Sequence, residues 1–528
     1  MAQPQPGKHT LIAREREPWL LFAAIMASSM AFIDSSALNV ALPALQADLG
    51  ASGADLLWIV NSYALLLAAL ILVGGALGDR FGRKRVFMLG IGLFAGSSAL
   101  CGLAPSAPAL IVARALQGAA GALMVPGSLS LIAALVPLER RGQAIGAWSA
   151  FSTITTILGP ALGGLLAGAG LWRMIFFINL PLALLALAAL RNNVPESHDP
   201  EEGSIDIPGA LLVTLGLVGV TYGSITAAER GLALDVVVAL VGGLLALAGF
   251  VLVEARSPHP MLPLSLFRSR AFSGTNAMTL FLYAALGGAL FFMPLNLIQV
   301  QGYDPGLAGL STLPFPLLLA LLSRRVGALS DRLGPRIPLT VGPALAGLGF
   351  LLYALPGVTN GPSDYWTTFF PATLMLGLGM AITVAPLSST VMTSAPPEHA
   401  GVASGISNAV SRAAGVLAVA VMGGLALLWF RAALETRSAA LELPPAAHEA
   451  LLAQANRLGE AQPPDGLTPT LAEAAQQAIQ LAFVDTFRLM MGIAAGLSWL
   501  SALLSALLLG DRNAAEVRRR EGDQGAGG

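Results

Sequence analysis

The stretch Gly75–Val86, GALGDRFGRKRV, decides the fold of this 528-residue chain. It holds five charged residues between two apolar runs, each of about 20 residues and therefore long enough to cross a bilayer. Lysine and arginine concentrate in the loops on the cytoplasmic side of a membrane. We interpret the stretch as a cytoplasmic loop between two membrane-spanning helices.

The composition agrees with a membrane protein. Hydrophobic residues make up 55% of the chain, charged residues 11%, and the mean hydropathy is +0.72. Soluble domains carry roughly 25% charge, so most of this surface must face lipid. The net charge of −1 argues against a nucleic-acid partner. The single cysteine, Cys101, cannot form an intramolecular disulfide and is interpreted as a small hydrophobic residue.

Apolar stretches separated by short polar or Gly/Pro-rich breaks recur along the whole chain. They predict fourteen spans, near 19–41, 56–77, 86–104, 108–136, 143–168, 174–190, 207–227, 233–253, 272–298, 306–328, 337–356, 366–391, 402–430 and 484–509. The first is longer than the 7–15 residues of a signal-peptide core, so we expect it to be retained as a helix.

Alternate connections carry the basic residues, which predicts that both termini are cytoplasmic and that the protein lies in the cell (inner) membrane. These connections contain Arg80–Arg85, Arg140 and Arg141, Arg256–Arg270, and Arg332–Arg336. The hydrophilic stretch 431–480 then lies outside. We expect a solvated loop on the membrane surface there, with short amphipathic helices as the alternative.

The opening stretch has a second copy, GALSDRLGPR, which begins at Gly327 with an offset of 252 residues. Transporter folds are commonly built from such repeats. Each copy follows the second span of a group of six, so two spans are left over between the groups. We predict a first six-helix bundle in 1–191, a linker with two inserted helices in 192–258, and a second bundle in 259–528.

The motif GALGDRFGRKRV resembles the loop motif of the major facilitator superfamily. Four further stretches are similar to the fourteen-span drug:proton antiporter branch, called EmrB/QacA-like: FIDSSALNVALP (32–43), RALQG (114–118), ILGPALGG (157–164) and WRMIFFINLP (172–181). The resemblance implies an all-α membrane protein with the major facilitator fold and inserted helices. It also implies exchange of protons for small organic molecules.

Asp34 is the main candidate for proton coupling. It lies about 15 residues, or roughly 22 Å, into the first span, where a carboxylate is costly and usually marks an ion or substrate pathway. Arg114 enters the fourth span from the opposite side to a depth of about 10 Å, so the two can share a site. The resemblance assigns proton coupling to both. The alternatives are an aspartate that reaches the outer interface and an arginine that binds backbone carbonyls.

Two motifs suggest gates. Pro160 kinks the fifth span and the neighbouring glycines allow close helix contact, which predicts a seal between the halves. In the loop motif, glycines permit a tight turn, and Asp79 can pair with Arg83 or with the loop at Glu139–Arg141, forming a latch; the alternative is that these charges only set topology. The predicted gating residues are Gly75, Asp79, Arg83, Glu139, Gly159, Pro160, Gly163, Gly164 and Asp331.

Adaptable or polar side chains within the spans are candidates for a substrate pocket. They are Asn39, Asn61, Tyr63, Met124, Phe151, Tyr283, Phe292, Asn296 and Arg412. Each can equally be a packing residue. The partner of Arg412 is not evident from the sequence.

The chain contains no phosphate-binding GxxxxGK[ST] motif, no spaced Cys/His cluster and no triad pattern. We therefore expect a monomeric transporter without cofactors, driven by a proton gradient, that exports amphipathic cationic or neutral compounds and is not an enzyme. Export of an endogenous lipid, siderophore or secondary metabolite is the first alternative. Uptake by symport and a non-transporting receptor are the others.

Overall fold

The computed structural model describes residues 12–197, 206–258, 260–395 and 400–510. These ranges contain helices and short connections but no strand; the side chains of Glu139 and Asp331 lie outside the description. Thirteen helices of the described part are long and apolar enough to cross a membrane. The remaining predicted span is α5 (Leu138–Gly168), with an apolar segment at Leu158–Gly168. The chain is an all-α, multi-pass membrane protein, as predicted.

Six spans form the first half of the molecule. They comprise α1 (Glu17–Leu49), α2 (Gly53–Phe81), α3 (Arg83–Leu103), α4 (Ala107–Leu135), α5, and the pair α6 (Met174–Phe177) and α7 (Asn179–Asn193). The sixth span is therefore broken near Ile178, which the hydropathy pattern did not reveal. The α1 helix packs against α4, α5 and α7, and α4 packs against both α2 and α3.

The two inserted helices are α8 (Ile207–Arg230) and α9 (Leu234–Arg256), which pack against each other. Of the two, α8 also contacts α2 of the first half and α15 (Ala400–Ser438) of the second. The inserted pair thus lies along the side of the seam between the halves rather than within either bundle.

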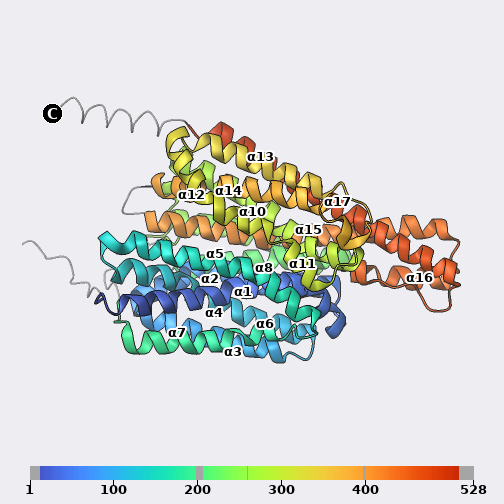
Figure 1. Cartoon of the computed structure of the whole chain (residues 1–528), viewed down its shortest axis with the longest axis horizontal. Coiled ribbons are helices and arrows are strands. Elements are labelled where there is room, and N and C mark those ends of the chain that lie inside the picture. Colours follow the sequence, from blue (N-terminus) through green and yellow to red (C-terminus); the bar gives the residue numbers. More distant parts are fainter. Residues whose placement is uncertain (1–11, 198–205, 259, 396–399, 511–528) are drawn as a thin grey trace, which may run out of the picture.

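The second half repeats the plan with irregular breaks. It comprises η1 (Leu264–Arg268), α10 (Arg270–Leu295), η2 (Asn296–Val300), α11 (Pro305–Ser311), α12 (Pro314–Leu333), α13 (Arg336–Tyr353), η3 (Gly361–Asp364), α14 (Phe369–Thr393), α15, η5 (Ala439–Leu441), α16 (Pro445–Ala453), η6 (Ala455–Glu460) and α17 (Pro469–Leu508). In Figure 1 the helices of the two halves form two layers, and α1 begins at the same end of the molecule at which α17 ends.

We call that end the basic end, because the loop between α2 and α3 lies there, and the opposite end the hairpin end. The expected surface loop at 431–480 is wrong in detail: α15 continues to Ser438, α17 begins at Pro469, and α16 and η6 lie between them. This helical hairpin extends beyond the bundle (Figure 1). It remains helical because its own buried residues, such as Leu451 and Leu458, pack into the core.

The buried apolar core is shared at one end and divided at the other. One cluster joins the halves at the hairpin end, with Leu42 and Phe176 of the first half packed in the same cluster as Phe292 and Phe487 of the second. At the basic end the core consists of two separate clusters, one in each half, and a smaller cluster joins Leu65 of α2 to Val416 of α15 through Leu217 of α8. Since buried apolar area stabilises contact between elements, the halves are held together chiefly at the hairpin end.

The two copies of the loop motif turn at equivalent glycines. Gly82 and Gly334, 252 residues apart, have φ of 109° and 81°, a region that residues with a side chain rarely adopt. The prediction that Gly75 supports the turn is wrong. Gly75 lies inside α2, and no atom of another element lies within 4 Å of where its Cβ would be.

Candidate functional site

Asp34 and Arg114 form an ion pair in the interior of the first half. The Arg114 Nη1 atom lies 2.5 Å from Asp34 Oδ2, and the two residues are 1% and 0% exposed. α1 and α4 run in opposite directions, so similar depths place the two side chains together, as the sequence predicted. Removing one partner of such a buried pair costs about 3–5 kcal/mol, because the other charge stays buried without compensation.

Gln117, which the sequence analysis overlooked, completes this pair. It lies one turn after Arg114; its Nε2 donates to Asp34 Oδ1 (2.8 Å) and to Ser98 Oγ (3.0 Å), and its Oε1 accepts from Arg114 (2.7 Å). Asn179 of α7 also donates to Ser98, at 2.8 Å. The motif RALQG contained a signal for this contact, because a glutamine three residues after an arginine lies on the same face of a helix. The network joins α1, α3, α4 and α7.

Aromatic rings surround the Arg114 guanidinium. The Tyr63 ring lies 4.2 Å from it and the Phe176 ring 5.9 Å, while its Nε donates to the Ile59 carbonyl at 3.3 Å. Tyr63 lies on α2, which packs against α15 of the second half, the helix that carries Arg412. No hydrogen bond or ion pair of Arg412 is found within the described residues. Tyr63 therefore contacts the paired Arg114 from a helix that also packs against the second half.

The Gly-Pro motif of α5 uses two faces. A Cβ on Gly159 or Gly163 would lie within 2.2 Å of atoms of Ser36 or Ala37, so this face packs against α1 of the same half. A Cβ on Gly164 would lie 2.3 Å from the Pro305 carbonyl oxygen of the second half. The predicted seal between the halves thus rests on only part of the motif.

The Pro160 carbonyl belongs to that second face. Its oxygen lies 2.2 Å from where a Cβ on Gly309 of α11 would be. A side chain on residue 309 would therefore prevent the two helices from packing as closely as they do. Contacts between α5 and α11 are extensive. They lie at the hairpin end, where the core of the two halves is continuous.

At the basic end, Asp79 and Arg83 pair within the motif at 2.5 Å. A contact of this motif with the loop at Glu139 is not described, because the Glu139 side chain lies outside the described part. Instead Glu196, which follows α7, accepts from the backbone N–H groups of Lys84 (2.9 Å) and Arg85 (3.2 Å). Its carboxylate caps the N-terminus of α3, where the helix dipole favours negative charge. The sequence analysis assigned no role to Glu196.

The predicted substrate residues differ in burial and in the part of the core to which they belong. Tyr63 and Met124 are buried in the core of the first half, and Phe292 in the shared core. Asn296 is buried and accepts from Gln301 at 3.4 Å, whereas Phe151 is 52% exposed. Asn61 is fully buried, and neither atom of its amide has a partner in the described structure. Asn39 and Tyr283 are partly buried.

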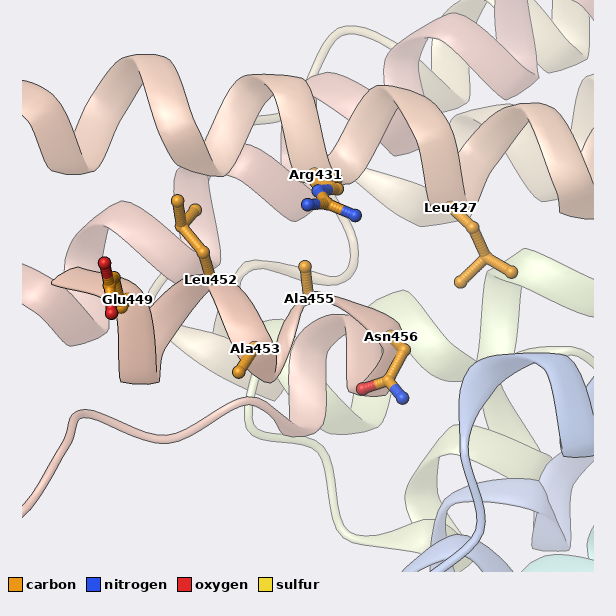
Figure 2. A pocket seen from close by; sticks show the side chains of 7 residues that line it. All are labelled: Leu427, Arg431, Glu449, Leu452, Ala453, Ala455 and Asn456. Carbon is orange, nitrogen blue, oxygen red and sulfur yellow. The ribbon is translucent and has the colours of Figure 1, made fainter. Parts of the chain in front are cut away.

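A pocket lies at the base of the hairpin, away from these residues. It is lined by Leu427, Arg431, Glu449, Leu452, Ala453, Ala455 and Asn456. Figure 2 shows Arg431 on the long helix α15, facing the shorter helical segments that carry Glu449 and Asn456. None of these residues was predicted. Within the described residues, no three His, Cys, Asp or Glu side chains gather as a metal site.

Comparison with known protein families identifies the family of this chain. The model of the family described as Major Facilitator Superfamily matches residues 24–419. The chain belongs to the Major Facilitator Superfamily. The family predicted from the loop motif is thereby confirmed, and the matched segment contains Asp34, Arg114 and both copies of the motif.

Curated relatives in this superfamily cover most of the chain. The multidrug resistance protein Stp of Mycobacterium tuberculosis is 34% identical over 422 residues, which are 79% of this chain and 77% of that protein. The tetracenomycin C resistance and export protein of Streptomyces glaucescens is 36% identical over 434 residues, covering 80% and 79% of the two chains.

Solved structures agree on the fold. A bacterial homologue of the human lysosomal transporter Spinster, in an inward-facing and unoccupied conformation, matches with a TM-score of 0.62 and 19% identity. The match covers 93% of this chain and 98% of that one.

Proposed function

We propose that this chain exports small amphipathic organic compounds, cationic or neutral, in exchange for protons. The observation that carries the proposal is the buried Asp34–Arg114 pair with its Gln117 bridge. A carboxylate enclosed by four helices has two ways to be stable, paired with arginine or protonated. Exchange between these two forms is what a proton-coupled carrier requires.

Protonation of Asp34 changes the contacts of its neighbours. When the carboxylate becomes neutral, Arg114 keeps the Ile59 carbonyl, Gln117 Oε1 and the Tyr63 face as partners. Because Tyr63 belongs to α2, which packs against α15, the change is transmitted to the second half through α2. This contact supports coupling between proton binding and movement of the two halves.

The proposed cycle alternates access between the two ends. In this state the largest buried cluster joins the halves at the hairpin end, whereas the clusters at the basic end are separate and only a small cluster joins α2, α8 and α15, which supports a conformation open toward the basic end. The basic loops support a cytoplasmic position for that end, with both termini on the same side and the protein in the cell membrane. Release to the outside then requires the α5–α11 contact to separate. The carrier acts without a cofactor, as a monomer, and leaves its substrate chemically unchanged.

The test uses purified protein in liposomes with an imposed pH gradient and ethidium as the transported cation. We expect ethidium to drive proton release, and Asp34→Asn to abolish that release while the protein remains folded. The matched control is Asp48→Asn, which removes a partly exposed ion pair with Arg173. Proton release that survives Asp34→Asn unchanged would contradict the mechanism, and absence of any flux from the unaltered protein would favour a receptor.

Export of a self-made metabolite is the second candidate. The relative from Streptomyces glaucescens is named for resistance to, and export of, tetracenomycin C. The same liposomes loaded with an aromatic polyketide distinguish the candidates, since a narrow exporter would move the polyketide but not ethidium.

A further inference from the structure

Two carboxylates meet where the inserted helix pair begins and ends. Asp206 is the N-cap of α8, and Glu254 lies in the last turn of α9, so both are at the basic end of the hairpin that these helices form. They are 7% and 2% exposed. Neither belongs to the proton-coupling network, and the role of the inserted pair is otherwise unexplained.

Each carboxylate has one oxygen engaged with the backbone. Asp206 Oδ1 accepts from the Gly209 N–H at 2.8 Å, and Glu254 Oε2 accepts from the Leu262 N–H at 2.9 Å. The other oxygens, Asp206 Oδ2 and Glu254 Oε1, are buried and have no hydrogen-bond partner in the described structure. A buried polar atom without a partner costs about 1–3 kcal/mol, and more when it is charged.

These two free oxygens approach the same point. A Cβ built on Gly209 would lie 2.8 Å from Asp206 Oδ2 and 2.9 Å from Glu254 Oε1. The space between the oxygens exists only because residue 209 has no side chain. Gly209, in the first turn of α8, thus leaves a small cradle bounded by two carboxylates.

Like charges in this position repel each other. The two carboxylates face each other in a buried position, and no Lys or Arg of the described part lies within ion-pair distance of either residue. Buried charges are paired, coordinate metal ions or become neutral. A cation at the point that both oxygens face would satisfy both carboxylates.

We propose that Asp206 and Glu254 bind a hydrated divalent cation, Mg²⁺, in this cradle. Mg²⁺ is usually held by one or two carboxylates together with waters, which agrees with two facing carboxylate oxygens. The bound ion neutralises both charges. It also ties the start of α8, the end of α9 and the segment at Leu262 that leads to the second half, so it fixes the inserted pair to the connection between the halves.

The experiment uses the full-length protein in detergent, with Mn²⁺ as a paramagnetic probe for the Mg²⁺ site. We expect saturable binding of one Mn²⁺ per chain, competed by Mg²⁺, and a higher thermal unfolding temperature in either metal. Both effects should be lost in Asp206→Asn and Glu254→Gln. The matched control, Asp235→Asn, changes an exposed acid at the other end of the same helix pair and should keep both effects.

Gly209→Ala keeps both carboxylates but fills the cradle, so it should weaken Mn²⁺ binding by about tenfold or more, a loss typical of perturbed metal sites. This variant decides the question if the acid substitutions fail to fold. Mn²⁺ binding that is unchanged in Gly209→Ala and Glu254→Gln would overturn the proposal. If no metal binds at millimolar concentration and the stability rises as the pH falls, the two carboxylates share a proton and the cation proposal is overturned.

Discussion

The two halves share a plan of helices but differ in what they bury at the same level. In the first half, Asp34, Arg114 and Gln117 form a charged network that is sealed from solvent. Position 34 corresponds, at the repeat offset of 252, to Leu286 in the second half. Buried polar groups of the second half make neutral contacts, such as Tyr353 with Thr373 at 2.7 Å.

The repeat therefore preserves the packing of the helices but not the chemistry of the buried side chains. A neutral hydrogen-bonded pair stabilises one arrangement of helices, whereas the proposed proton exchange gives the Asp34–Arg114 pair two forms, paired and protonated. The first half can therefore act as the switch, while the second half supplies a surface that responds. Four experiments test this asymmetry.

The largest effect is expected for the two arginines. Arg114→Leu leaves the Asp34 carboxylate buried and unpaired, and should lower the free energy of unfolding by about 4 kcal/mol. Arg412→Leu, which removes no described hydrogen bond or ion pair, should cost less than about 1 kcal/mol. Unfolding in detergent measures both. Equal losses in the two variants would show that the halves bury charge in the same way. Adding Asp34→Asn to Arg114→Leu should restore most of the lost free energy of unfolding, because no unpaired charge then remains.

Gly164→Ala tests the seam between the halves. The added methyl group would meet the Pro305 carbonyl, and overpacking of this kind costs about 1–3 kcal/mol, so the closed hairpin end should open. Spin labels at the exposed residues Leu171 and Val358 should then move apart. Gly168→Ala is the control, since its nearest neighbour would lie at 3.5 Å. An unchanged distance in Gly164→Ala would remove the seam from the gating mechanism.

Gln117→Leu and Gln301→Leu separate coupling from packing. The first removes donors to Asp34 and Ser98, and the second removes contacts to Asn296, Gly357 and Thr359. Both should lower stability by about 2 kcal/mol. Only Gln117→Leu should lower ethidium-driven proton release in liposomes, because it removes a hydrogen-bond donor from Asp34. A loss of proton release in both variants would place coupling in the second half too.

The smallest effect concerns the two loop motifs. Glu196→Gln weakens the cap on α3 and should cost about 1 kcal/mol, with faster tryptic cleavage at Lys84 and Arg85. Glu435→Gln, an exposed acid of α15, is the control and should leave cleavage unchanged. Identical cleavage in both variants would mean that the contact does not hold the first loop.

The membrane class, the family and the depth of the main pair could be predicted from the sequence. Apolar runs and basic loops follow from the cost of placing polar groups in lipid, and depth follows from the rise of a helix. The same reasoning wrongly assigned Gly75 to the turn, because the sequence of the loop motif does not show where the preceding helix ends. It also could not separate the two faces of α5 or find the breaks in the sixth and tenth spans.

What only the tertiary structure decided is which distant residues meet. Gln117 and Asn179 are ordinary amides in the sequence, and they become part of one network because α3, α4 and α7 converge on Asp34. Asp206 precedes the first helix of the inserted hairpin and Glu254 ends the second, and only the antiparallel packing of the two helices brings their free oxygens together. Local periodicity and solvation act within a segment and can be read along the chain. The pairing of polar groups across segments depends on how the helices pack.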